Sequence, residues 1–243
     1  VYKRQTGASN VFVGASAAEL GVVTGASNTG VGFEALKDLT SATRATAVGM
    51  RALQNLTTGT ATIGIGGNAG EGITTGGSNI CIGDQAGATF DTETDNMFIG
   101  ANAGKGPISG GENNIGIGNN SLDALTSGDK NTVLGYGAGT DLTEAANVTL
   151  VGYGAGANIT TGSGSVFIGK DAGLTVTTTS GNTAVGYRAG ESLTSGNNVL
   201  LGYKAGLNAT TLDGNTILGY SAVGAGVLTG NNNVVIGKLA GND

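Results

Sequence analysis

Few residues of this chain could carry out chemistry, and their types restrict which chemistry that could be. The 243 residues include no His, a single Cys and only 12% charged residues. His is the commonest general base and the commonest imidazole ligand of metals, so the usual residue for both tasks is missing. Cys81 stands alone and can form no disulfide within the chain. We therefore expect a chain that is not an enzyme and holds no cofactor, with no catalytic and no metal-binding residues.

Three carboxylates, Asp91, Glu93 and Asp95, alternate along one stretch. Carboxylate oxygens are the ligands that Ca²⁺ prefers, so this stretch could hold an ion. A solvated loop explains the same residues, and the sequence lacks the Gly- and Asp-rich nonapeptide of calcium-binding β-rolls. We interpret the stretch as a solvated loop.

Five of the six tyrosines recur at one position of a regular spacing, which Lys170 interrupts. They are Tyr136, Tyr153, Tyr187, Tyr203 and Tyr220. A line of exposed aromatic rings, like the Thr-rich stretches that recur with them, could bind surface glycans. The alternative is a structural ladder in which each ring covers the apolar edge of its neighbour. Both interpretations of this row remain open.

A repeat of 16 to 18 residues positions these side chains and fills the chain. Its anchor is a Gly that follows Val, Ile or Leu and precedes a small residue by three positions. The anchors are Gly14, Gly32, Gly49, Gly66, Gly83, Gly100, Gly118, Gly135, Gly152, Gly169, Gly186, Gly202, Gly219 and Gly237. Much of the unusual total of 48 Gly belongs to this repeat, and a single Pro excludes collagen.

Three columns of the repeat predict structural ladders, because identical positions stack when coils lie on one another. The first column is the anchor glycine, the second is the Ala three positions later, and the third is an Asn four positions before the anchor. Representative members are Gly83, Gly100, Gly135 and Gly186; Ala86, Ala103, Ala138 and Ala189; and Asn79, Asn96, Asn131 and Asn182. A buried Asn row can satisfy its amides along the stack, and glycines suit the corners of a narrow coil.

The three residues before each anchor are mostly β-branched or aliphatic and predict one short strand per repeat. One strand per 17 residues, joined by Gly-rich turns, predicts an all-β parallel β-solenoid of about fourteen coils. Thirteen steps of about 4.8 Å give a rod of roughly 60 Å. No helical periodicity competes with this prediction.

Both faces of the predicted strand are apolar, because the first, second and third residues are all apolar or small. A strand of this kind is buried on both sides. A coil with one strand encloses little volume, so the outer face needs a partner. We expect copies of the same chain around an axis, most simply a homotrimer.

The stretch NTAVGYRAG at residues 182–190 and its relatives in the other repeats resemble the head repeats of trimeric autotransporter adhesins. Similar repeats occur in tail-fibre-like proteins of phages and environmental bacteria. The resemblance covers residues 7 to 243 and implies a β-roll wound by three chains in an extracellular appendage, surface adhesin or phage tail fibre. The adhesin repeat is shorter by about three residues, because here a Thr-rich loop is inserted.

The remaining expectations concern organisation and partners. Residues 1–6 do not match the repeat, and residues 7–243 are expected to form a single solenoid domain. Neither end carries a polar capping repeat, so we expect a piece of something longer or end-to-end stacking. A net charge of −6 disfavours nucleic acid, and no apolar run approaches the roughly 18 residues of a membrane span. The sequence thus predicts a structural fibre located outside the cell or on a virion, or alternatively a glycan-binding module.

Overall fold

The computed structural model describes residues 6–20, 22–209, 213–225, 228 and 230–242. The chain forms two compact units, Val1–Asn120 with Ala124–Ser127, and Ser121–Asp123 with Gly128–Asp243. Both are built from strands and turns, and the described ranges contain no helix, hence none that could cross a membrane. Apart from Thr6, whose amide donates to the Val23 carbonyl (3.0 Å), the non-repeat segment lies outside these ranges.

Each repeat contributes one strand of three residues, which ends directly before its anchor glycine. The first unit contains β1 (Val11–Val13), β2 (Thr29–Val31), β3 (Thr46–Val48), β4 (Ile63–Ile65), β5 (Ile80–Ile82), β6 (Met97–Ile99) and β7 (Ile115–Ile117). The second contains β8 (Thr132–Leu134), β9 (Thr149–Val151), β10 (Val166–Ile168), β11 (Thr183–Val185), β12 (Val199–Leu201), β13 (Thr216–Leu218) and β14 (Val234–Ile236).

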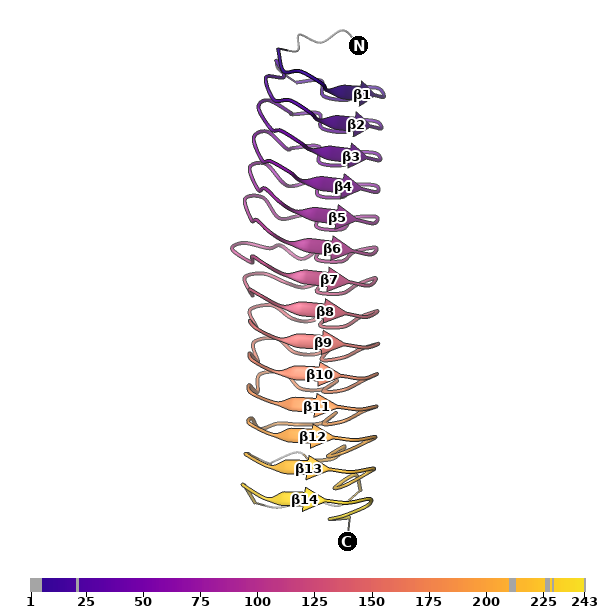
Figure 1. The fold of residues 1–243 in the computed structure, drawn as a ribbon, viewed down its shortest axis with the longest axis vertical. Coiled ribbons are helices and arrows are strands. Elements are labelled where there is room, and N and C mark those ends of the chain that lie inside the picture. Colours follow the sequence, from indigo (N-terminus) through magenta and orange to yellow (C-terminus); the bar gives the residue numbers. More distant parts are fainter. Residues whose placement is uncertain (1–5, 21, 210–212, 226–227, 229, 243) are drawn as a thin grey trace. The chain divides into compact units, whose positions relative to one another are not determined.

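Within each unit, every strand pairs in parallel and in register with the next strand along the chain (Figure 1). Val166 of β10, for example, lies opposite Thr183 of β11 and Thr149 of β9. In-register pairing places equivalent residues of successive repeats side by side. The prediction of an all-β parallel β-solenoid with one strand per repeat is confirmed.

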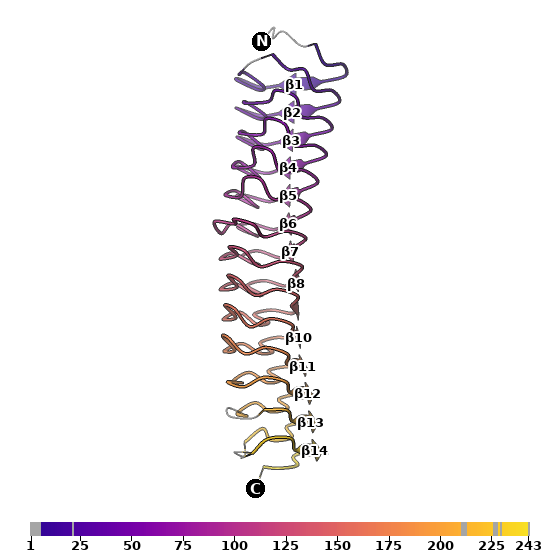
Figure 2. The ribbon, with the colours of Figure 1, turned by 90° about the vertical axis from the view of Figure 1, so that its left-hand side faces the viewer.

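The turn after each strand relies on left-handed backbone at the second and fourth residues after the anchor. Glu34 and Leu36 have φ of 57° and 54°, although neither is glycine. The Glu34 amide donates to the Ala15 carbonyl of the preceding coil (3.0 Å), and the Leu36 amide donates to Ala52 of the following coil (3.1 Å). The left-handed residues thus direct amides toward both neighbours, which offsets the cost of their conformation. The turns of each unit are seen from the side in Figure 2.

The anchor glycines have both an unusual backbone conformation and a close neighbour. Gly83 has φ of 133°, and a Cβ added to it would lie 2.5 Å from the carbonyl oxygen of Gly100. Real Cβ atoms do not approach backbone this closely. Glycine is therefore required here by conformation and by space.

In several coils the interior sets a large residue against a small one. The middle residue of every strand points inward and faces the residue four positions after the anchor. Phe98 of β6 faces Gly104, where an added Cβ would lie 2.4 Å from the Phe98 ring, whereas Gly30 of β2 faces the buried Leu36. In these coils the small residue leaves room for the large one, so the side chains can pack closely.

The outward face of the strands is uncovered in the single chain. In β3, Ala47 is fully buried whereas Val48 is 39% exposed, and in β13 Ile217 is buried whereas Leu218 is 41% exposed. Burial on both faces, expected from the sequence, is therefore provided only on the inner face. The reason is geometric: each coil has a single strand, and its turns return along the inner side alone.

Candidate binding surface

The residue directly after each anchor glycine lies at an exposed corner of the coil. In the second unit this column contains the predicted row of tyrosines, each between 37% and 55% exposed. Because the strands are in register, the side chains of neighbouring coils lie side by side. The structure therefore brings all five tyrosines of the row to one corner of the second unit.

The tyrosine rings stack on one another. Tyr136 and Tyr153 have centroids 5.4 Å apart and planes 9° apart, and Tyr203 and Tyr220 are similar at 4.9 Å and 8°. Tyr187 stacks on Tyr203 at 5.2 Å. Each ring thus covers part of its neighbour, as in the ladder interpretation, while an exposed portion remains for contact with a ligand.

Lysines lie over the same rings. Lys170, which interrupts the row, places its Nζ 5.3 Å from the centroid of Tyr153, and Lys204 places its Nζ 5.2 Å from that of Tyr203. An ammonium group over an aromatic face is favourable by about 0.5–1 kcal/mol at exposed sites. Lys170 has no ring, but its ammonium group contacts the face of the preceding tyrosine in the row.

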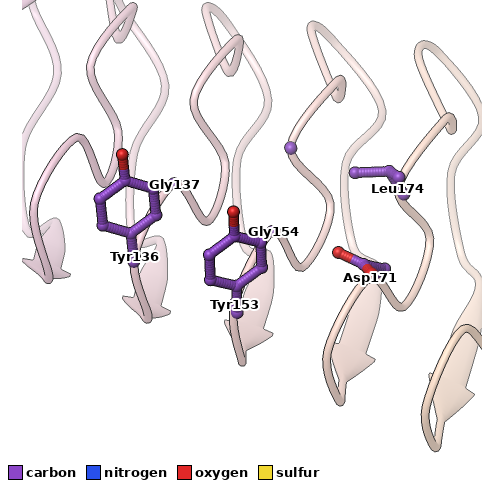
Figure 3. A pocket seen from close by; sticks show the side chains of 7 residues that line it. Tyr136, Gly137, Tyr153, Gly154, Asp171 and Leu174 are labelled. Atoms are coloured by element: carbon purple, nitrogen blue, oxygen red, sulfur yellow. The ribbon is translucent and has the colours of Figure 1, made fainter.

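A hollow of about 300 Å³ opens beside the first two tyrosines. It is lined by Tyr136, Gly137, Tyr153, Gly154, Ala157, Asp171 and Leu174. Figure 3 shows the two rings side by side with their hydroxyls pointing the same way, and Asp171 and Leu174 pointing back toward Tyr153. Sequence reasoning found the tyrosines and missed the hollow. The available signal was that only Gly137 and Gly154 are glycines at the second position after an anchor.

The Thr-rich turns use their hydroxyls internally. Thr57 Oγ1 donates to the carbonyl of Thr74 (3.0 Å), and Thr40 Oγ1 donates to that of Thr57 (2.9 Å). The same bond recurs from Thr160 to Thr177 at 3.2 Å. These hydroxyls stabilise the stack, so the tyrosine row is the stronger candidate for binding.

The Asn side chains form a buried hydrogen-bonded column. Asn79 Oδ1 accepts from the backbone amide of Asn96 (3.0 Å), and its Nδ2 donates to the carbonyl of Glu93 (2.7 Å). Asn131 and Asn182 lie in the same buried column of the second unit, where Asn182 Oδ1 accepts from the Asn198 amide at 3.0 Å. Asn79 thus bonds to the next coil through both its side-chain oxygen and its side-chain nitrogen.

The predicted Ala positions are fully buried beside the anchors. They are Ala86, Ala103, Ala138 and Ala189, and each donates its amide to the anchor carbonyl three residues earlier, namely to Gly83, Gly100, Gly135 and Gly186. Only a small side chain fits at this tight turn.

The acidic loop is organised around Glu93. Its Oε2 accepts from the amides of Asp91 (2.8 Å) and Thr92 (3.0 Å), and its Oε1 accepts from the amide of Gly110 (2.8 Å). Glu93 therefore holds two loops together through backbone donors. In the described part of the chain, no three Cys, Asp or Glu side chains are grouped to hold a metal ion.

Ion pairs neutralise several exposed charges outside the row. Glu34 pairs with Lys37 (2.7 Å) and with Arg51 of the next coil (3.0 Å). The hydrogen bond from Lys37 and that from Arg51 lower the pKa of Glu34 below its usual range. In the second unit, Glu191 raises the pKa of Arg188 by a direct hydrogen bond. These pairs cross-link the surface of the coils.

Cys81 is fully buried in the middle of β5, and this burial raises the pKa of its thiol well above the ordinary value. Because the thiolate is the reactive form, we expect native protein to react with Ellman's reagent at least about a hundredfold more slowly than protein unfolded in urea. The measurement is the rate of colour release in each state. Equal rates would contradict the packing described for β5.

Comparisons with protein-family models, with curated proteins and with solved structures gave no match.

Proposed function

We propose that this chain is a non-enzymatic structural segment of a fibre, in an extracellular appendage, a surface adhesin or a phage tail fibre. The observation that carries the proposal is the uncovered apolar face of the strands. Val48 and Ile65 on neighbouring strands of the first unit are 39% and 38% exposed, and Leu134 in the second is 47% exposed. Extended apolar surfaces of this kind mark sites of protein association.

Copies of the same chain are the simplest cover for this face. The face repeats with every coil, so an identical repeating surface matches it in register along the whole stack. Three chains around an axis would bury the outer faces together and supply the second side that each thin coil lacks. We therefore propose a homotrimer, with end-to-end stacking as the means of extending the fibre.

The proposed role is mechanical. Backbone hydrogen bonds run from coil to coil, as from Val166 to Asn182 (2.8 Å), and the buried Asn column adds side-chain bonds in the same direction. Such a stack resists bending and local opening because each coil is held by both neighbours. Exposed corner residues would then present the surface of the fibre.

The test is the mass of the protein in solution, measured by sedimentation equilibrium. We expect three chains per particle, and short rods or filaments in electron micrographs. The double substitution Val48→Lys with Ile65→Lys should release monomers with unchanged circular dichroism, because two buried cations oppose association. Thr58→Lys, at an exposed turn position, is the matched control and should leave the trimer intact. A monodisperse wild-type monomer would refute the proposal.

A further inference from the structure

The hollow beside Tyr136 and Tyr153 arises from two missing side chains. The second position after the anchor is Gly137 in one coil and Gly154 in the next, and the hollow lies over both. In every other repeat this position carries a side chain larger than hydrogen. An aromatic surface is therefore left open at its flank in these two coils.

At other apolar pairs of the same column, charged side chains take the place of the two glycines. In the first unit, Phe33 and Met50 are exposed corner residues, but their flank is occupied by Glu34 and Arg51, which pair at 3.0 Å. In the second unit the residues beside the Tyr187–Tyr203 stack are Arg188, which pairs with Glu191, and Lys204, whose Nζ lies 5.2 Å from the Tyr203 ring centroid. The hollow thus combines two parallel tyrosine rings with a glycine directly after each tyrosine.

The chemistry of the lining is that of a sugar site. The parallel rings of Tyr136 and Tyr153 lie side by side (Figure 3) and offer a flat apolar floor. Ala157 and Leu174 add apolar wall, and the Asp171 carboxylate supplies a hydrogen-bond acceptor at one end. A pyranose has a matching apolar C–H face and a rim of hydroxyls. The volume is at the lower end of the range of small-molecule pockets, roughly 300–1,000 Å³, which suits a single sugar ring.

The charges of Asp171 and Lys170 restrict which ligands the hollow can bind. Asp171 disfavours an anionic ligand, because a second carboxylate would lie beside the first and would have to share Lys170 with it. A cationic ligand meets competition, because Lys170 already lies over the Tyr153 ring (5.3 Å) and 3.9 Å from Asp171. A neutral ring with hydroxyls can donate to Asp171 and accept from Lys170 without displacing either.

We propose that the Tyr136–Tyr153 hollow binds a neutral hexopyranose, with the sugar's C–H face on the rings and its hydroxyls on Asp171. Asp171 accepts hydrogen bonds from the sugar hydroxyls and thereby orients the sugar ring. Its backbone amide donates to the Tyr153 carbonyl (2.9 Å), which fixes it relative to the aromatic floor. This binding function is separate from the proposed assembly, which uses the outward face of the strands.

The test is titration of the full chain with the methyl glycosides of glucose, galactose and mannose, followed by saturation-transfer NMR and calorimetry. N-acetylneuraminic acid is the anionic comparison ligand and glucosamine is the cationic one. We expect at least one neutral glycoside to bind and both charged sugars to bind more weakly. Tyr153→Ala should weaken binding about tenfold or more, and Asp171→Asn about fivefold.

The sharpest variant fills the hollow from its glycine side. At position 154 the added side chain also displaces the Asp171 carboxylate, because a Cβ there would lie 2.8 Å from Asp171 Oδ1. Asn occupies the same column at Asn68, Asn102 and Asn120 with φ of 54° to 57°, so Gly137→Asn with Gly154→Asn is compatible with the fold. This variant should abolish binding while its melting curve stays unchanged. Tyr203→Ala removes a ring that does not line the Tyr136–Tyr153 hollow, so it is the control and should bind like wild type. Failure of every neutral glycoside to bind, or binding that survives the filled hollow, would overturn the proposal.

Discussion

Replacement of Gly186 by Ala is expected to destabilise the second unit by about 3–5 kcal/mol. Gly186 has φ of 139°, a conformation that L-residues rarely adopt, and an added Cβ would lie 2.2 Å from the carbonyl oxygen of Gly202. The backbone has no room to relax, because Gly186 donates to Ile168 and Gly202 donates to Val185, both at 2.8 Å. Urea denaturation followed by circular dichroism measures the change in the free energy of unfolding.

The matched control for Gly186→Ala is Gly164→Asn. Gly164 also has positive φ, at 66°, but nothing lies within 4 Å of an added Cβ, and Asn147 and Asn197 occupy the same column at 58° and 59°. This substitution should change the free energy of unfolding by less than about 0.5 kcal/mol. If both variants lost the same stability, close approach between coils could not be the reason for the anchor glycine.

Asn198→Leu is expected to lower the free energy of unfolding by about 3–5 kcal/mol, because it leaves buried polar groups of neighbouring residues without hydrogen-bond partners. Asn198 is fully buried, and its Oδ1 accepts from the backbone amide of Asn215 at 2.9 Å. Its Nδ2 donates to the carbonyl of Gly196 at 2.8 Å. Leucine has a similar volume but can satisfy neither group, so the loss is one of hydrogen bonding. Thermal and urea unfolding of the variant provide the measurement.

Asn198→Ser separates hydrogen bonding from packing in that experiment. Ser165 occupies the same column naturally, and its Oγ accepts from the Asn182 amide at 3.2 Å. Serine should therefore retain the bond to Asn215 and recover part of the stability, in spite of its smaller volume. A Ser variant less stable than the Leu variant would show that volume, and not amide satisfaction, dominates this column.

The position of every strand could be predicted from the sequence. The three residues before each anchor are branched or aliphatic, and this local preference agrees with the register that stacking imposes. Val199–Leu201 of β12 follows a repeat one or two residues shorter than the others and still pairs in register with Thr183–Val185 of β11. The turn absorbs the deletion, because only the strand and anchor columns must align.

The repeat by itself determined the solenoid, the buried Asn column and the common line of the tyrosines. When coils stack in register, residues one repeat apart in the sequence lie next to each other on successive coils. Only the tertiary structure decided which large residue packs against which small one, as Phe98 packs against Gly104. That contact depends on how the turn folds back. The tertiary structure also decided that Gly137 and Gly154 open a hollow beside the tyrosine rings. A missing side chain leaves space only where the surrounding backbone and neighbouring coils do not fill it, and that is a property of packing in three dimensions.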